Sequence, residues 1–301
     1  MGQGDADMGM TPERLKALLA FEALSFTLDD AASVSAQGHV VERLRFNLAD
    51  GQTVRGLLTR PVGPMQRRPA ILHCHAHGGR YEIGAGELLD GRPALLDPPG
   101  PALAREGFVV LSIDMPTFGE RAGEKEDAAA KAALWHGKTL FGRMVSEQAA
   151  ALTWLCERPD VDAERIAVTG LSMGATLAYF LAAVDPRPAA VAHLCCYADL
   201  ADLVSTGAHD LHGHYLTIPG LLRETSTGEI AGLVAPRPQL ICVGEDDPLT
   251  PPAAVATALQ GTRAAYADAQ ASLVFLSQPH VGHRETPAMR RALITFLHNY
   301  L

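Results

Sequence analysis

The sequence predicts an α/β protein with a doubly wound, mostly parallel sheet that is flanked by helices and begins with an antiparallel hairpin. Three observations support this prediction. Short apolar segments alternate with longer segments of helical pattern along most of the chain. The short segments are apolar on both faces, as expected for strands buried in a parallel sheet. Before them lie two segments of alternating apolar and polar residues around a turn, a pattern typical of a hairpin.

A helix and the hairpin are expected first. The helix covers residues 11–23, because Thr11 suits the N-cap and Pro12 suits the first turn. The hairpin strands cover residues 39–48 and 53–60, and an Ala-Asp-Gly-Gln turn separates them.

The parallel part of the sheet follows the hairpin. Its strands are expected at residues 70–75, 108–114, 165–170, 189–196, 239–244 and 272–277. Helices are expected at residues 140–158, 173–184, 251–268 and 285–300. Strands that alternate with helices in this way form parallel sheets through right-handed crossovers.

We expect a single domain over residues 1–301. Of these residues, 48% are hydrophobic, and no repeat, low-complexity tract or clear linker interrupts the chain. Three segments, at about 78–100, 115–139 and 197–235, are too irregular to be plain connections. Long loops in a compact domain are usually functional, so we expect these segments to be active-site insertions.

Charge and hydropathy exclude two classes of partner. The net charge is −9 and the isoelectric point is about 5.7. An acidic surface repels phosphate backbones, so we expect no nucleic-acid partner. The sequence has no apolar run of about 18 residues, so we expect no membrane span.

The N-terminus and the cysteines favour the cytoplasm. The first ten residues, MGQGDADMGM, are polar and acidic and lack the pattern of a secretory signal, and Ala6 stands where a myristoylation motif needs Ser or Thr. The five cysteines lie in apolar segments without CxxC spacing, which favours reduced core thiols. They are Cys74, Cys156, Cys195, Cys196 and Cys242.

The segment Gly170-Leu171-Ser172-Met173-Gly174 matches the pattern G-x-S-x-G. An apolar β-branched strand precedes it and an apolar helix follows it, which is the context that a nucleophile elbow requires. The sharp turn lifts the serine hydroxyl above the sheet, and the helix N-terminus directs free N–H groups at developing negative charge. The alternative is an ordinary tight turn with a capping serine.

A nucleophilic serine needs a base and an acid that orients the base, and after such an elbow the acid precedes the histidine along the chain. Asp247 follows the strand 239–244, and His283 follows the strand 272–277. Glu245 and Asp246 compete with Asp247 for the acid role, and His280 competes with His283 for the base role. We favour Asp247 because of its spacing from Gly244 and Pro251, and His283 because Gly282 precedes it.

The loop after strand 70–75 is expected to complete an oxyanion hole. One donor is the backbone N–H of Met173, and the other is the N–H of His77, with Gly78 as the next choice. The segment also contains His73 and His75, so a metal site is the alternative, since H-x-H-x-H resembles part of the metallo-β-lactamase-like motif. Other positions of that motif do not match and no later ligand set stands out, so we expect no metal.

Together these motifs resemble the α/β-hydrolase superfamily over roughly residues 40–300. The segments 87–91, 114–121, 140–152 and 213–222, with APRPQL at 235–240, are similar to dienelactone-hydrolase-like and acetyl-xylan-esterase-like serine esterases. Two departures from the family pattern are Ala76, in place of the Gly of the oxyanion segment, and Thr117, where such loops often have Gly.

The resemblance implies hydrolysis of carboxylic esters without a cofactor, through an acyl-enzyme, with a small-molecule ester as partner. Homo-oligomerisation is compatible with the sequence. Candidate substrate contacts in the insertions are Trp135, His214, Tyr215 and Arg121, with His136, His212 and Arg80 also available. The same triad would serve an amidase, peptidase, lactonase or C–C hydrolase. From other classes, a metallohydrolase using His73, His75 and His77 and a non-catalytic binding protein remain alternatives.

Overall fold

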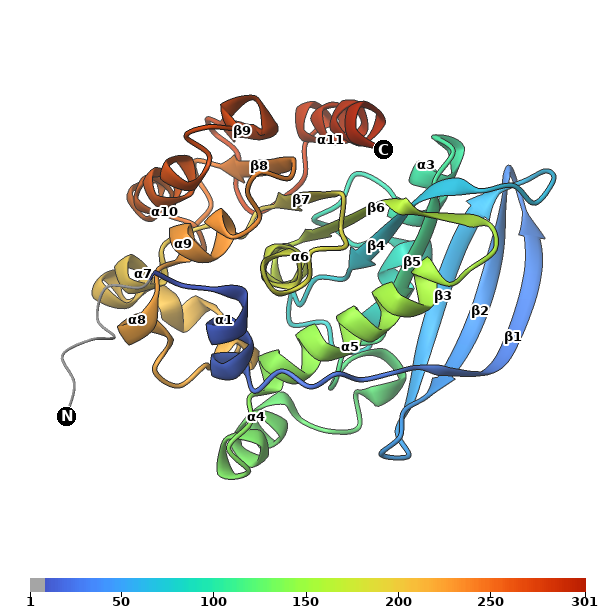
Figure 1. Ribbon diagram of the computed structural model, residues 1–301, viewed down its shortest axis with the longest axis horizontal. Helices are drawn as coiled ribbons and strands as arrows, with labels where there is room; N and C mark the ends of the chain where they lie inside the picture. The colour runs from blue at the N-terminus through green and yellow to red at the C-terminus, as the bar shows by residue number, and fades with distance from the viewer. Residues whose placement is uncertain (1–8) are drawn as a thin grey trace.

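The computed structural model describes residues 9–301. In that part of the chain, nine strands form one sheet in the order β1-β2-β3-β5-β4-β6-β7-β8-β9 (Figure 1). Residues 1–8, which carry most of the segment behind the expectation of no targeting signal, lie outside the described residues. The strands are β1 Thr27–Ala36, β2 His39–Asn47, β3 Thr53–Pro61, β4 Arg68–Cys74, β5 Val109–Ile113, β6 Val161–Leu171, β7 Ala190–Leu194, β8 Gln239–Gly244 and β9 Leu273–Gln278.

Strands β4 to β9 are parallel, and β1, β2 and β3 form an antiparallel extension that joins the parallel part through β3 and β5. This arrangement confirms the predicted fold class, including the hairpin β2–β3. The chain passes from β4 to β5 on one side and then to β6 on the other side of β4. Such a reversal of strand order leaves a crevice at the carboxyl ends of β4 and β6, where ligands bind in open α/β sheets.

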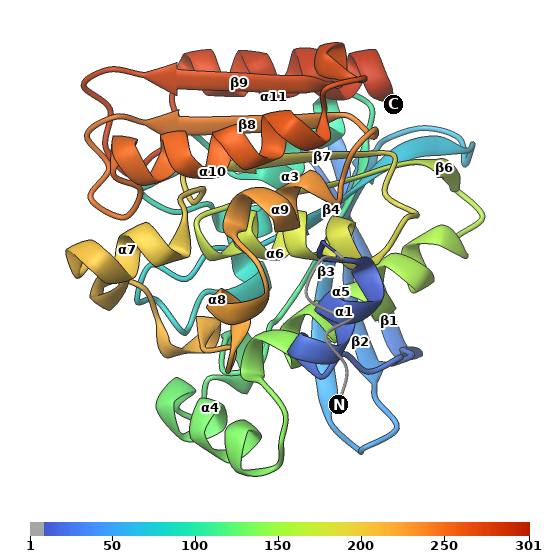
Figure 2. The ribbon, with the colours of Figure 1, turned by 60° about the vertical axis from the view of Figure 1, so that its left-hand side comes forward.

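Helices cover both faces of the sheet. Helices α5 (Leu140–Cys156) and α6 (Met173–Val184) pack on one face, and α3 (Pro99–Arg105) and α11 (Pro287–Tyr300) pack on the other. Figures 1 and 2 show α1 beside α5 and α6 on the first face. The remaining helices are α1 Pro12–Leu19, α2 Glu87–Asp90, α4 Glu126–Trp135, α7 Leu200–Thr206, α8 Leu221–Glu224, α9 Thr227–Gly232 and α10 Pro252–Ala265.

The core has two layers, one on each face of the sheet. Leu15 of α1, Phe141 of α5 and Leu177 of α6 belong to the first layer. Leu103 of α3 and Phe296 of α11 belong to the second layer. The sheet between the layers is therefore buried on both faces, which explains the continuous apolar runs of its central strands.

The largest differences from the sequence prediction lie near the start of the chain, and most other elements begin or end a few residues from the predicted positions. Strand β1 was not predicted, because its ten residues, TLDDAASVSA, are all exposed and have no alternating apolar pattern. Backbone pairing with β2 holds β1 in the sheet, and burial of its side chains does not. The first helix ends at Leu19 and not at residue 23, because Ala20 adopts a left-handed conformation with φ of 51°.

The three predicted insertions contain short helices rather than plain loops. Helix α2 lies in the first, α4 lies in the second, and α7, α8 and α9 lie in the third. Within residues 9–301, no helix is long and apolar enough to span a membrane. The insertions follow β4, β5 and β7, so they leave the sheet at the carboxyl ends of strands.

Candidate active site

Ser172 occupies the turn between β6 and α6. Its φ and ψ angles are 60° and −125°, a combination that non-glycine residues rarely adopt. A Cβ atom at Gly170 would overlap the backbone of Gly174, and a Cβ atom at Gly174 would overlap the carbonyl of Cys74. The two glycines are therefore needed for the strand, turn and helix to approach this closely, as expected for a nucleophile elbow.

Asp247 and His283 form a direct hydrogen bond. The Nδ1–H of His283 donates to Oδ2 of Asp247 at 2.7 Å. The other carboxylate oxygen, Oδ1, accepts from the backbone N–H of Leu249 at 2.9 Å. Because the buried Asp247 accepts the hydrogen bond from Nδ1–H of His283, the imidazole is held in the tautomer whose Nε2 is free to accept a proton.

The residues that compete for the base and acid roles take no part in the His283–Asp247 hydrogen bond. The side chain of His280 is 93% exposed and its Nδ1 lies 3.8 Å from Asp246 Oδ2. Glu245 accepts a hydrogen bond from the hydroxyl of Ser277 at 2.8 Å.

The elbow and the His283 loop are linked through β7. The N–H of Ser172 donates to the carbonyl of Leu194 at 2.9 Å. The next residue, Cys195, has its thiol 3.4 Å from the carbonyl of Arg284, which follows His283. These contacts bring Ser172 and the His283–Asp247 pair to the same edge of the sheet.

The loop after β4 is held by a buried ion pair between Glu87 and Arg92. Glu87 Oε2 accepts from the N–H of Ala76 at 3.0 Å, so that N–H has a partner within the protein. Arg92 donates to the carbonyls of Ala76 at 2.8 Å and His77 at 3.1 Å. In a trans peptide the C=O and the following N–H point in opposite directions, so the N–H groups of His77 and Gly78 face away from Arg92.

Glu87 is ionised although it is buried. Burial raises the pKa of its carboxyl group, but the hydrogen bond and charge of His73 and the charge of Arg92 outweigh burial and lower the pKa below its usual value. Sequence reasoning used residues 87–91 only for the family resemblance and did not identify Arg92. A buried carboxylate in an irregular segment has no periodic pattern that would reveal it.

His73, His75 and His77, the candidate metal ligands, each have their own hydrogen-bond partners. His73 contacts Thr169 Oγ1 at 3.1 Å and Glu87 Oε1 at 2.9 Å. His75 Nε2 accepts from the N–H of Met115 at 3.2 Å, and burial lowers the pKa of its imidazole. His77 Nε2 lies 2.5 Å from Glu126 Oε2. In the described part of the chain, no group of three or more His, Cys, Asp or Glu side chains is placed to hold a metal ion.

Thr117, one of the two departures from the family pattern, changes the local backbone and the packing around it. Thr117 has a φ of 71°, a left-handed conformation that favours glycine. It precedes Phe118, whose ring packs against both His75 and His77 with centroid distances of 5.1 Å. The strained Thr117 turn therefore places an aromatic ring against the loop after β4.

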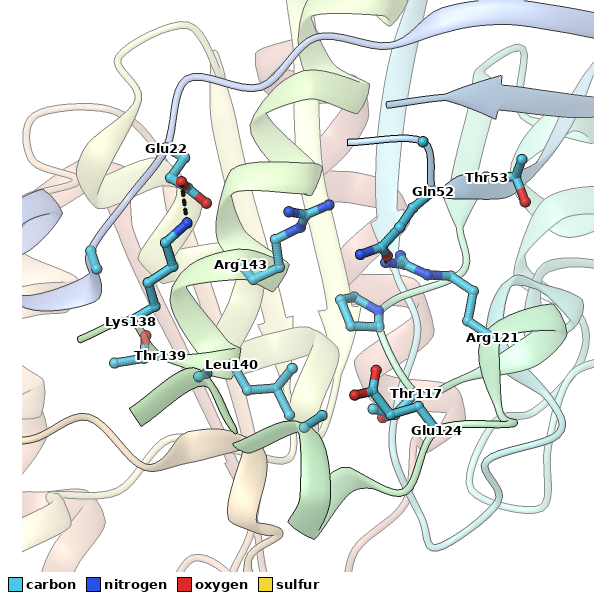
Figure 3. Close-up of a pocket in the computed structure, with 15 residues that line it drawn as sticks. Glu22, Gln52, Thr53, Thr117, Arg121, Glu124, Lys138, Thr139, Leu140 and Arg143 are labelled. Carbon is cyan, nitrogen blue, oxygen red and sulfur yellow. Dashed lines mark hydrogen bonds and ion pairs between the residues drawn. The ribbon is translucent and has the colours of Figure 1, made fainter. Parts of the chain in front are cut away.

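Arg121 lines a cavity whose lining does not include Ser172, Asp247 or His283. The cavity has a volume of about 500 Å³ and lies between the β2–β3 turn, the loop after β5 and the start of α5 (Figure 3). Arg121 donates to both carboxylate oxygens of Glu147, at 2.5 and 3.0 Å, and to Gln52 at 2.7 Å. No triad residue lines this cavity.

The other candidate substrate contacts are spread over the insertions. Trp135 is 82% exposed at the end of α4, and His214 pairs with Asp127 at the surface at 2.6 Å. Tyr215 is only 3% exposed, so its ring faces the protein interior. His212 contacts the carbonyl of Leu249, two residues after Asp247, at 3.1 Å, so it lies near the His283–Asp247 pair.

Comparison with known proteins identifies the family of the chain. The sequence profile of the Dienelactone hydrolase family matches residues 100–284. The Bacillus subtilis protein named "Putative hydrolase YtaP" is 34% identical over 265 residues, which cover 87% of this chain and 89% of that protein.

Solved structures share the fold at lower identity. An acetyl xylan esterase from Paenibacillus sp. R4 superposes with a TM-score of 0.66 at 21% identity, covering 96% of this chain and 93% of that one. A promiscuous CE15 esterase from a marine bacterial metagenome gives a TM-score of 0.70 at 15% identity, covering 96% and 91%. The profile match and the identity to the Bacillus protein confirm the resemblance seen in the sequence: the chain belongs to the dienelactone hydrolase family, a family of carboxylic ester hydrolases.

Proposed function

We propose that the protein is a serine esterase whose triad is Ser172, His283 and Asp247. The observation that carries the proposal is the hydrogen bond of 2.7 Å between His283 and Asp247, at the sheet edge where Ser172 occupies its strained turn. Acyl transfer needs a nucleophile, a base and an acid that orients the base, and these three residues supply the required groups.

The reaction has two steps. His283 Nε2 removes the proton of Ser172 as the hydroxyl oxygen attacks the ester carbonyl carbon, and then returns that proton to the departing alcohol as the acyl-enzyme forms. In the second step His283 activates a water molecule, which releases the acid and restores Ser172. Asp247 keeps the imidazole in the productive tautomer and stabilises its charged form.

The tetrahedral oxygen in each step needs two N–H donors at about 3 Å. The backbone N–H of Met173 at the start of α6 is one of them in this proposal. The N–H of His77 is the other donor, and the N–H of Gly78 is the next choice. Both N–H groups are available because Arg92 holds the carbonyls of Ala76 and His77 on the opposite side of the loop.

The cysteines are poor alternatives to Ser172 as nucleophile. Cys74, Cys195 and Cys242 are buried, and burial raises the pKa of each thiol. The thiolate is the reactive form of cysteine, so these residues stay unreactive near neutral pH.

A fluorophosphonate probe, used with and without a chelator, tests the proposal against its rivals. Covalent labelling at Ser172 that does not change with chelator, and that the Ser172→Ala variant lacks, supports the serine mechanism. Absence of labelling, with activity lost to chelator, supports a metallohydrolase, and absence of both labelling and activity supports a binding protein. Matched ester, amide and lactone substrates then separate the hydrolases that share this triad.

A further inference from the structure

The carboxylate of Glu126 lies at the point where the three insertions meet. Glu126 is the first residue of α4 and is 4% exposed. Its Oε2 accepts from His77 Nε2 at 2.5 Å and from the hydroxyl of Tyr81 at 3.2 Å. Its Oε1 accepts from the backbone N–H of Tyr215 at 2.9 Å. One buried side chain therefore contacts the oxyanion loop, the first insertion and the third insertion.

The position of the proton on His77 follows from its second nitrogen. The N–H of Gly79 donates to Nδ1 of His77 at 2.9 Å, so Nδ1 carries no hydrogen and Nε2–H points at Glu126. Burial raises the pKa of Glu126, but the hydrogen bond and charge of His77 and the hydrogen bonds from Tyr215 and Tyr81 outweigh burial and lower the pKa. Glu126 is therefore a carboxylate that accepts the Nε2–H of His77.

Close packing around this contact leaves no room for an added side chain. A Cβ atom at Gly213 would lie 2.8 Å from Glu126 Oε1 and 2.9 Å from His77 Nε2. The rings of Tyr81 and Tyr215 lie 5.0 and 5.6 Å from the His77 ring, measured between centroids. The imidazole is thus enclosed by residues from separate insertions, and Glu126 accepts hydrogen bonds from two of them, Tyr81 and Tyr215.

The backbone and the side chain of His77 are held from two directions. Arg92 holds the carbonyls of Ala76 and His77, and Glu126 holds the imidazole. With both ends fixed, the direction of the His77 N–H is determined, although Gly78 and Gly79 next to it have φ angles of 56° and 66° and would otherwise allow the loop to turn.

We propose that Glu126 is a positioning residue for the oxyanion hole: by holding the imidazole of His77, it fixes the direction of the His77 N–H and makes turnover depend on the placement of α4 and of the segment at Gly213–Tyr215. This inference rests on the proposed serine esterase function. A donor that stabilises only the transition state affects kcat more than KM, because ground-state binding does not use it.

The first test compares Glu126→Gln with Glu124→Gln on a short p-nitrophenyl ester. Glutamine keeps the size of Glu126 but replaces one acceptor oxygen with a donor and removes the charge. We expect kcat to fall by about 3- to 10-fold, no more than in His77→Ala, with KM within about twofold, because both variants lose the same tether and keep the backbone N–H. Glu124 is exposed and lies two residues earlier, so Glu124→Gln should keep the kcat of the wild type.

The second test uses His77 and does not depend on the folding of the Glu126 variant. His77→Ala removes the tether but keeps the backbone N–H. His77→Gln restores a donor at the position of Nε2, whereas His77→Asn restores only the position of Nδ1. We expect His77→Gln to recover much of the kcat that His77→Ala loses, and His77→Asn to recover little. The double variant Glu126→Gln/His77→Ala should lose no more than the worse single variant.

Several results would overturn the inference. They are a wild-type kcat in Glu126→Gln, losses that multiply in the double variant, and equal kcat for His77→Gln and His77→Ala. In every variant, kcat is measured for the part of the ester hydrolysis that the Ser172→Ala substitution abolishes. If wild-type hydrolysis does not depend on Ser172, the proposed function itself fails, so the two failures are distinguishable.

Discussion

At the scale of single residues, the candidate site combines a strained serine with a well-bonded pair of partners. Ser172 holds a φ of 60°, which costs about 1–3 kcal/mol at a non-glycine position. His283 and Asp247, which meet at 2.7 Å, are not among the described residues with a positive φ. Of these three residues, only the one that must present its hydroxyl group has a left-handed backbone.

The acid assignment can be tested by comparing adjacent carboxylates. Asp247→Asn should lower turnover by about 10⁴-fold, because the amide stabilises the wrong histidine tautomer. Asp246→Asn is the matched control and should change turnover little, since Asp246 is exposed and lies 3.8 Å from the exposed His280. Steady-state kinetics on one ester decide the matter, and a severe loss in Asp246→Asn alone would show that the acid is misassigned.

A second residue-scale prediction concerns the backbone of the oxyanion loop. Gly78 has a φ of 56°, and proline both removes its N–H and requires a φ near −65°. We expect Gly78→Pro to lower kcat by about 10²- to 10³-fold, and His77→Ala, which keeps the N–H, to lower it by about tenfold or less. The opposite ranking, together with zinc bound to the wild type and lost from His77→Ala, would favour the metal interpretation of this segment.

The residues that could be predicted from the sequence are those with a fixed relation to a strand. Ser172, Asp247 and His283 each follow an apolar segment, so their place at the sheet edge follows from strand order. Glu87, Arg92 and Glu126 hold the loop after β4 but lie in irregular insertions, where no periodicity indicates which polar residues are buried. The same lack of periodicity explains why Tyr215 was predicted as a substrate contact, although the structure buries its side chain.

At the scale of elements, the elbow depends on the contact between β4, β6 and α6. The strands of the parallel sheet and the hairpin β2–β3 could be predicted because burial on one or both faces leaves an apolar pattern. The edge strand β1 could not, because backbone pairing alone holds it. The approach of α6 to β4 was indicated only by the glycines at positions 170 and 174.

That approach gives a stability prediction. In Gly174→Ala the new methyl group would overlap the backbone of Cys74, which cannot move away as a side chain can. We expect a loss of about 1–3 kcal/mol or more in the free energy of unfolding, together with loss of activity. Gly123→Ala is the control, because no atom lies within 4 Å of a Cβ atom there. Thermal unfolding of both variants measures the difference, and equal melting temperatures would contradict the close contact at the elbow.

At the scale of the whole molecule, a buried histidine links stability to pH. His193 of β7 is buried between tyrosine rings, accepts at Nε2 from Gln239 at 2.9 Å, and has no partner at Nδ1 among the described residues. Burial lowers the pKa of His193 from 6.5 to about 3. The unfolded chain therefore binds one more proton than the folded protein between these values, so stability falls as the pH drops below 6.5.

His193→Gln should remove that dependence. Between pH 6 and pH 4 the free energy of unfolding of the wild type should fall more steeply than that of the variant, by about 1.4 kcal/mol per pH unit. The control is His280→Gln, which changes a side chain that is 93% exposed and should keep the slope of the wild type. Denaturant unfolding across this pH range gives the slopes, and parallel slopes for wild type and His193→Gln would show that His193 does not stay neutral in the fold.

The central claim is that Ser172 is the nucleophile of ester hydrolysis, and the turnover of Ser172→Ala on a short p-nitrophenyl ester tests it most directly. Ser172 lies in a turn whose shape is set by Gly170 and Gly174, so the alanine variant should keep the fold, as circular dichroism and the melting temperature would show. The account predicts that turnover falls by about 10⁴- to 10⁶-fold in the folded variant. A folded Ser172→Ala protein that hydrolyses the ester at the rate of the wild type would contradict it.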